Sequence, residues 1–167
     1  MNVAEFSNRF AVRRLKEPDI PDACTLCKGN PIFYEYCPPE VSEEGIRDDM
    51  YALPPGKTME DKYYLGYFDS ERLIAVMDFI DGYPRRNVAF IGFFMMDKAE
   101  QGKGIGSAII EELCGYLRLR GYAAVRLGWV KGNAQSEGFW HKNGFAETGA
   151  CYDTNGYTVI VAERPLE

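Results

Sequence analysis

The chain shows two hydrophobic patterns, one with helical spacing and one made of the apolar runs typical of strands. Apolar residues that recur every three or four positions indicate amphipathic helices. The helices predicted in this way occupy residues 17–30, 42–53, 104–120 and 133–143. Short runs rich in β-branched and aromatic residues, bounded by turn residues, indicate strands. The predicted strands occupy residues 10–15, 62–68, 72–80, 88–96, 123–130, 145–152 and 156–163.

The order of these segments predicts one mixed α/β domain that covers residues 1–167. The strands at 62–68, 72–80 and 88–96 follow one another across short turn clusters, which is typical of an antiparallel meander. The segment "PIFYEYCPPE" (31–40) is rich in aromatic residues and proline and is expected to be a loop.

Composition narrows the possible functions. A net charge of −6 over 167 residues argues against general nucleic-acid binding, which needs a basic face. No apolar run reaches the roughly 18 residues of a membrane span, and the N-terminus lacks the apolar core of a signal peptide. We therefore expect a cytoplasmic protein, a monomer or a homodimer, with no nucleic-acid or membrane partner.

The cysteines do not make a convincing metal site. Cys24 and Cys27 form a lone C-x-x-C, Cys37 follows ten residues later, and the only histidine, His141, is far along the chain. A zinc site would need a fourth ligand nearby. On a helix the C-x-x-C spacing places two small apolar side chains on one face, so we expect buried thiols and no metal.

Glycines crowd the start of the helix at 104–120, in the segment Gln101-Gly102-Lys103-Gly104-Ile105-Gly106-Ser107. A helix start offers unpaired N–H groups and the positive end of the helix dipole, so a bare backbone there can approach a phosphate. The alternative is that the glycines only ease a tight strand-to-helix turn. Neither the phosphate-binding loop of nucleotide hydrolases nor the dinucleotide signature G-x-G-x-x-G fits this spacing.

The pattern Gln101-x-x-Gly104-x-Gly106 resembles the acyl-coenzyme A motif of the GCN5-related N-acetyltransferase (GNAT) family. The segment "GNAQSEGFWHKNGF" (132–145) is similar to the closing helix of that family. The resemblance implies a predominantly antiparallel, twisted sheet with splayed central strands, flanked by about four helices. It also implies acetyl-CoA as the cosubstrate.

The resemblance assigns cofactor contacts to three parts of the chain. The strand backbone that would pair with the pantetheine arm belongs to Phe94, Met95 and Met96. The amides that would hold the pyrophosphate belong to Gln101, Gly102, Lys103, Gly104, Ile105, Gly106 and Ser107. Asn133 would reach the arm or only cap its helix, Trp140 would form a wall of the acyl pocket, and Lys142 would face the phosphates.

The catalytic groups depart from the family pattern, because Trp140 stands where the family often has a tyrosine that protonates the leaving thiolate. Indole has no proton of suitable pKa, so the expected acid is Tyr152, with Tyr157 or a water molecule as alternatives. Asp78 interrupts an apolar strand, where the pKa of a carboxyl rises, and is the candidate base. Its alternative role is structural.

Two functions from different classes remain open. The first is transfer of an acetyl group from acetyl-CoA to a primary amine on a small molecule or a peptide. The second is a non-catalytic acyl-CoA-binding sensor or partner domain. Tyr34, Glu35 and Tyr51 are candidate substrate-binding residues because aromatic rings and a carboxylate suit an amine. They could equally pack the helices onto the sheet.

Overall fold

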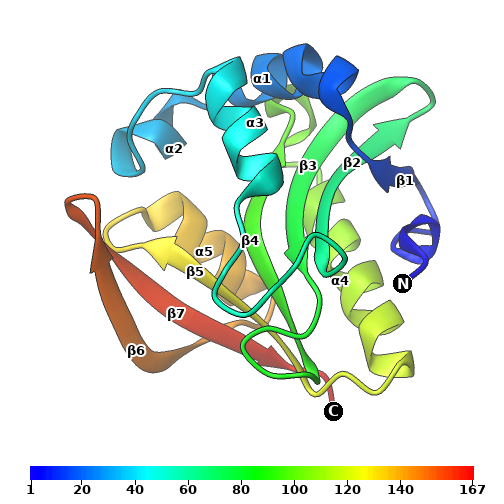
Figure 1. The fold of residues 1–167 in the computed structure, drawn as a ribbon, viewed down its shortest axis with the longest axis vertical. Coiled ribbons are helices and arrows are strands. Elements are labelled where there is room, and N and C mark those ends of the chain that lie inside the picture. Colours follow the sequence, from blue (N-terminus) through cyan, green and yellow to red (C-terminus); the bar gives the residue numbers. More distant parts are fainter.

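The computed structural model describes all residues from 1 to 167 and contains one seven-stranded sheet with helices on both faces (Figure 1). The strands are β1 (Ala11–Arg14), β2 (Lys62–Asp69), β3 (Arg72–Ile80), β4 (Val88–Met96), β5 (Ala124–Val130), β6 (Ala146–Thr154) and β7 (Tyr157–Pro165). The helices are α1 (Ile20–Lys28), α2 (Pro31–Tyr36), α3 (Glu43–Tyr51), α4 (Ile105–Leu119) and α5 (Ala134–Lys142). Three short 3-10 turns occupy Val3–Glu5, Glu17–Asp19 and Lys98–Glu100.

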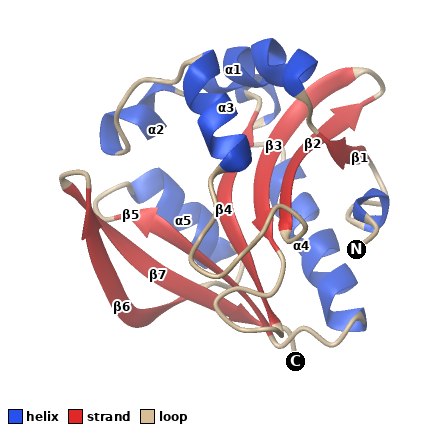
Figure 2. Cartoon of the chain, viewed as in Figure 1, coloured by secondary structure: helices blue, strands red, loops and turns tan.

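The strand order is β1-β2-β3-β4-β5-β7-β6, and only the β4–β5 pair is parallel. The antiparallel meander predicted from the sequence is confirmed in β2, β3 and β4, and so is the mixed, mostly antiparallel fold class. Figure 2 shows how the two halves of the sheet, β1–β4 and β5–β7, meet at one end and diverge at the other.

The divergence begins within the central pair. β4 and β5 pair at four positions only, from Val88 opposite Ala124 to Ile91 opposite Leu127. On its other side β4 has a bulge, because Asp78 of β3 pairs with Phe93 while Phe79 pairs with Ile91. Gly92 is therefore the extra residue of β4, at the point where the two central strands separate.

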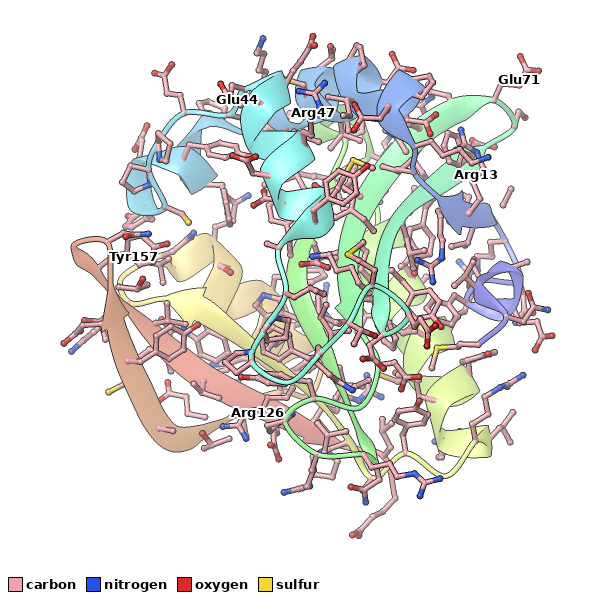
Figure 3. All side chains as sticks on the ribbon, in the orientation of Figure 1. Arg13, Glu44, Arg47, Glu71, Arg126 and Tyr157 are labelled. Atoms are coloured by element: carbon pink, nitrogen blue, oxygen red, sulfur yellow. The ribbon has the colours of Figure 1, made fainter.

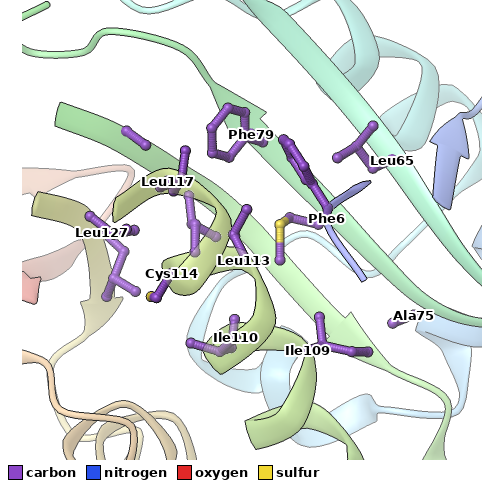
Figure 4. Close-up of a cluster of buried hydrophobic side chains, with 14 of the residues drawn as sticks. Phe6, Leu65, Ala75, Phe79, Ile109, Ile110, Leu113, Cys114, Leu117 and Leu127 are labelled. Carbon is purple, nitrogen blue, oxygen red and sulfur yellow. The ribbon is translucent and has the colours of Figure 1, made fainter. Parts of the chain in front are cut away.

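Each face of the sheet is covered by a separate apolar cluster. On one face α4 packs a stripe of fully buried residues that includes Ile109, Leu113 and Leu117, as the helical spacing predicts (Figure 4). On the other face α1 and α3 pack through a smaller cluster that includes Ile20, Cys24 and Ile46. The sheet is thus the middle layer of three.

The sequence-based prediction was wrong for residues 31–40, where Pro31–Tyr36 form α2 rather than a loop. Proline suits the first turn of a helix, and the ring of Phe33 packs edge-on against Phe93 at 5.4 Å between centroids. This tertiary contact holds a turn of helix that has too little periodicity to be recognised. None of the helices has the length and hydropathy that a membrane crossing requires.

Candidate active site

A cleft of about 520 Å³ opens where β4 and β5 separate. Its walls come from β4, β5, α2, α5, the segment leading into α4, and the β6–β7 hairpin. Elements far apart in the sequence therefore contribute to one site, which is the arrangement expected of a binding or catalytic centre.

The glycine-rich segment forms one end of this cleft. Gly102 and Gly104 have φ values of +75° and +79°, a region that side chains other than glycine rarely adopt, and the space beside both is open. The first hydrogen bond of α4 runs from Ala108 N–H to Gly104 O, so the N–H groups of residues 105–107 have no acceptor in the chain. This end of the cleft has the properties of an anion site.

The Gln101 side chain forms hydrogen bonds with other residues of the protein. Its Nε2 donates to Asn30 Oδ1 at 2.5 Å and to the Met96 carbonyl at 3.3 Å. Buried Asn30 also donates to that carbonyl, at 3.0 Å. This cross-link ties the α1–α2 junction to the end of β4, and sequence reasoning missed Asn30 because its partners are remote.

The backbone of β4 presents two of the three predicted residues to the cleft. Asp97 N–H donates to Ile74 O, and in an antiparallel pair successive residues alternate toward and away from the partner strand. Phe94 and Met96 therefore direct their polar groups away from β3, along an edge that β5 no longer covers. Met95 faces β3, and its side chain packs in the α1–α3 cluster.

Aromatic rings and a capped helix form the wall opposite. Phe94 stacks on Phe139, with centroids 5.9 Å apart, and the Phe139 ring lies against Gly106. Trp140 borders the cleft but is 6% exposed and belongs to the core. Asn133 accepts from Ser136 N–H, which confirms its role as a helix cap.

Of the remaining predicted cofactor residues, only some line the cleft. Lys142 and Ser107 line the cleft, whereas the side chains of Lys103 and Ile105 do not. Lys103 forms an ion pair with Glu100 at 3.2 Å.

Asp78 lies beside the cleft, behind Gly92. A Cβ on Gly92 would be only 2.6 Å from Asp78 Oδ2, so the absence of a side chain leaves the carboxylate next to the cleft. Oδ2 accepts from Lys62 Nζ at 2.8 Å, and buried Oδ1 has no partner. Burial raises the pKa of Asp78 to about 6, and the Lys62 ammonium opposes part of that rise. The raised pKa agrees with the expectation for a carboxyl on an apolar strand.

Lys62 and Gly92 were missed by sequence reasoning. Lys62 is 1% exposed, and its ammonium also donates to Ala52 O at 2.9 Å. Nothing in the local sequence marks a buried lysine. A glycine inside an apolar strand, in contrast, is a known sign of a bulge and could have identified Gly92.

Two tyrosines of the β6–β7 hairpin line the end of the cleft away from the glycines. Tyr152 is 51% exposed, and partial burial followed by the neighbouring Tyr83 and Cys37 raises its pKa. Cys37 Sγ donates to the Tyr157 hydroxyl at 3.3 Å, and this bond together with burial raises the pKa of Tyr157 to about 12. Figure 3 shows Tyr157 between the hairpin and the end of α2. Both hydroxyls therefore keep their protons at neutral pH.

The predicted substrate-binding residues do not line the cleft. Tyr34 is half-buried and packs edge-on against Phe33. Glu35 is exposed on α2, and Tyr51 borders a separate depression near Glu17, to which its hydroxyl donates at 3.3 Å. The residues of the same segment that line the cleft are Pro31, Ile32, Phe33 and Cys37.

One group of potential metal ligands lies elsewhere. Glu137, His141 and Glu147 bring their ligand atoms within 4.8 Å of one another, and His141 and Glu147 are exposed. Exposed carboxylates gather in this way without a metal. Cys24 and Cys27 are buried on α1, and burial raises the pKa of the Cys27 thiol to about 12.

Comparison with known families identifies the fold. The model of the acetyltransferase (GNAT) family matches residues 30–145, a range that contains the glycine-rich segment, β4, β5 and α5. No curated protein sequence matches the chain closely enough to count as a relative.

Solved structures share this fold at low sequence identity. An acetyltransferase from Salmonella typhimurium that modifies the N-terminal serine of ribosomal protein L7/L12 is 21% identical, with a TM-score of 0.74 over 97% of this chain and 98% of the other. An acetyltransferase from Thermus thermophilus is 18% identical, with a TM-score of 0.74 over 93% and 96%. A Thermoplasma acidophilum N-acetyltransferase in complex with coenzyme A is 18% identical, with a TM-score of 0.65 over 93% and 98%.

The raised pKa of Asp78 predicts a pH-dependent stability difference between the parent protein and Asp78→Asn. In the folded protein Asp78 holds its proton up to about pH 6, whereas in the unfolded chain the carboxyl loses it near 3.8. The stabilisation of the folded state by this protonated carboxyl is therefore present below pH 4 and is lost as pH rises through 6. The stability of the parent relative to Asp78→Asn should fall by up to ~3 kcal/mol between pH 4 and 7. Urea unfolding of both proteins at each pH measures this, and a constant difference would contradict it.

Proposed function

The chain belongs to the acetyltransferase (GNAT) family, and from this premise we propose that it transfers an acetyl group directly from acetyl-CoA to a primary amine. The observation that carries the proposal is a cleft with an anion site at one end and a desolvated carboxylate beside Gly92 of its lining. Acetyl-CoA supplies the acetyl thioester. The residues of the chain bind it, polarise the carbonyl and move two protons.

The unpaired N–H groups at the start of α4 would bind the pyrophosphate, because they are free donors at the positive end of the helix dipole. The free edge of β4 would bind the pantetheine amides through Phe94, as an added strand, because the Met96 carbonyl already accepts from Asn30 and Gln101. The N–H of Met96 would stabilise the negative charge that develops on the carbonyl oxygen.

Asp78 would act as the base that accepts a proton from the ammonium of the acceptor. A base works best with a pKa near the working pH, and the value of about 6 leaves Asp78 ionised at neutral pH. Its Oδ2 is the oxygen nearest to Gly92 and the cleft and also accepts from Lys62, whereas Oδ1 is buried without a partner.

Tyr152 would donate a proton to the departing sulfur. It lines the cleft, and its raised pKa keeps the hydroxyl protonated at neutral pH, so that a proton is present when the thiolate leaves. Trp140 would only shape the acyl pocket, since it packs in the core against Phe145 at 5.1 Å. Loss of the family's tyrosine at this place also keeps the alternative of a non-catalytic acyl-CoA sensor open, and turnover separates the two.

Saturating CoA should stabilise the parent protein, and Gly104→Val should remove this effect. At 100 times the dissociation constant a ligand stabilises by ~2.7 kcal/mol, and for a domain of this size the melting temperature should rise by roughly 5–10 °C. The valine methyl groups would occupy the space where the phosphate must lie. Thermal unfolding with and without CoA measures the shift.

Gly56→Val is the matched control for backbone strain. Gly56 has a φ of +78° and open space around it, like Gly104, but lies outside the cleft. Both variants should lose stability, and only Gly56→Val should keep the CoA-dependent shift. A full shift in folded Gly104→Val would refute the placement of the pyrophosphate.

Asp78→Asn should change the pH profile of acetyl transfer. In the parent, kcat/KM should rise with pH through a midpoint near 6, where Asp78 ionises. In the variant, this rise of kcat/KM with pH should disappear. Its kcat should also fall by about 10²-fold or more, which is the usual contribution of a general base. Asp61→Asn, which changes a half-buried aspartate outside the cleft that pairs with Lys57 at 3.3 Å, is the control and should keep the parent profile. An unaltered rise of kcat/KM with pH in Asp78→Asn would assign the base to another group.

Tyr152→Phe should lower kcat by roughly 10²-fold or more and leave CoA affinity unchanged, because it removes only the hydroxyl. Tyr36→Phe, a change on the exposed face of α2 outside the cleft, serves as the control. Steady-state kinetics at saturating acetyl-CoA measure the effect. If Tyr157→Phe shows the loss instead, Tyr157 is the acid, and if neither does, a water molecule supplies the proton.

A further inference from the structure

Charged side chains line only one end of the cleft. Of all its lining residues, only Lys98, Glu100 and Lys142 carry a charge. Lys98 and Glu100 lie in the turn that leads into the glycine-rich segment. Lys142 follows Phe139 by one helical turn, and the Phe139 ring lies against Gly106. All three therefore belong to the end of the cleft that carries the anion site.

The aromatic lining residues Phe33, Phe90, Phe93 and Tyr157, together with Val159, carry no charge and are named here the aromatic end. Phe33 packs edge-on against Phe93 at 5.4 Å, and Phe90 packs edge-on against Tyr83 at the same distance. A Cβ on Gly128 would be 2.5 Å from Val159 Cγ1, so the floor between these strands is close-packed and apolar.

Two charged residues beside the aromatic end are already paired. Arg126 stands opposite Phe90 in the parallel register and forms an ion pair with Glu163 at 3.0 Å (Figure 3). Asp78, behind Gly92, is paired with Lys62. Apart from Lys98, Glu100 and Lys142, no lining residue offers a charge to a second charged group of the acceptor, and Asp78 beside Gly92 is the carboxylate that its ammonium can face.

A contact between distant segments joins two walls of the cleft at the aromatic end. Cys37, directly after α2, donates to Tyr157 at the start of β7, which is 120 residues away in the sequence. Figure 1 shows α2 and the β6–β7 turn reaching toward each other on the same side of the molecule. An acceptor that extended past this point would have to break the contact, so the site favours a small molecule over an extended peptide.

We propose that the acceptor is a small monoamine whose body is aromatic or apolar and carries no second charge. A buried charge without a partner is costly, so a carboxylate or a second ammonium at the aromatic end would oppose binding. Rings, in contrast, would pack edge-on against Phe33 and Phe90 while the single ammonium faces Asp78. This inference rests on the proposed function, since it names the substrate class of the same site.

Binding to the CoA-bound protein tests the inference without requiring turnover. Calorimetry should give an affinity for 2-phenylethylamine at least about 10²-fold higher than for phenylalanine, which adds a carboxylate, or for 1,5-diaminopentane, which adds an ammonium. A tetrapeptide with an N-terminal alanine should also bind more weakly than 2-phenylethylamine. Equal or tighter binding of any of these three compounds would overturn the inference.

Release of free CoA with the same four amines tests the proposed function separately. Turnover should follow the order of affinity. Selective binding of 2-phenylethylamine without release of CoA would sink the acetyltransferase proposal and leave the substrate class standing. Turnover with phenylalanine, the diamine or the peptide at a kcat/KM above that of 2-phenylethylamine would overturn the substrate class and leave the acetyltransferase proposal standing.

Thr154→Lys provides a gain-of-recognition variant, because half-buried Thr154 lines the cleft and is paired with Tyr157 in the hairpin. The new ammonium should raise the affinity for phenylalanine about tenfold and lower that for 2-phenylethylamine. Thr154→Val, which adds no charge, should keep the parent preference. A preference that is the same in both variants would show that charge at this end does not select the acceptor.

Discussion

The central strands β4 and β5 pair at only four positions before they part, and this leaves the outer backbone of β4 without a neighbouring strand. Buried N–H and C=O groups that lack partners are costly, so such an edge persists only where other groups or a ligand satisfy it. Asn30 and Gln101 satisfy the Met96 carbonyl from outside the sheet. The rest of the open edge is the surface that we propose for cosubstrate binding, and the position of α4, α5 and the C-terminal hairpin follows from the angle between the two half-sheets.

The bulge at Gly92 links that geometry to the electrostatics of the site. The extra residue bends β4 where the strands separate, and its missing side chain leaves Asp78 beside the cleft. Lys62 keeps the carboxylate from becoming fully neutral, while burial keeps its pKa near 6. Burial without Lys62 would raise the pKa of Asp78 further, and an ion pair in solvent would lower it. The balance between burial and the Lys62 ammonium therefore sets the proton affinity of Asp78.

Polarity divides the cleft along its length. Helix-start amides and flanking lysines occupy one end, and rings with paired charges occupy the other. Asp78 lies beside Gly92 of the cleft. Under the proposed function, a polyanionic cosubstrate and an uncharged acceptor body would be directed to different parts of the cleft by desolvation and charge.

The sequence by itself determined the features that depend on local spacing: the meander, the buried stripe of α4, the Asn133 cap and the glycine-rich start of α4, whose positive φ angles only glycine adopts easily. The tertiary structure decided the partners. Gln101 meets Asn30, which is 71 residues away, Cys37 meets Tyr157, and Tyr51 is carried out of the cleft by the direction of α3. Periodicity reports which face of an element is buried, but not which remote side chain lies against it. Those partners are fixed by strand register, by the bulge and by the angle between the half-sheets. These features exist only in the folded chain, so the local sequence pattern does not reveal them.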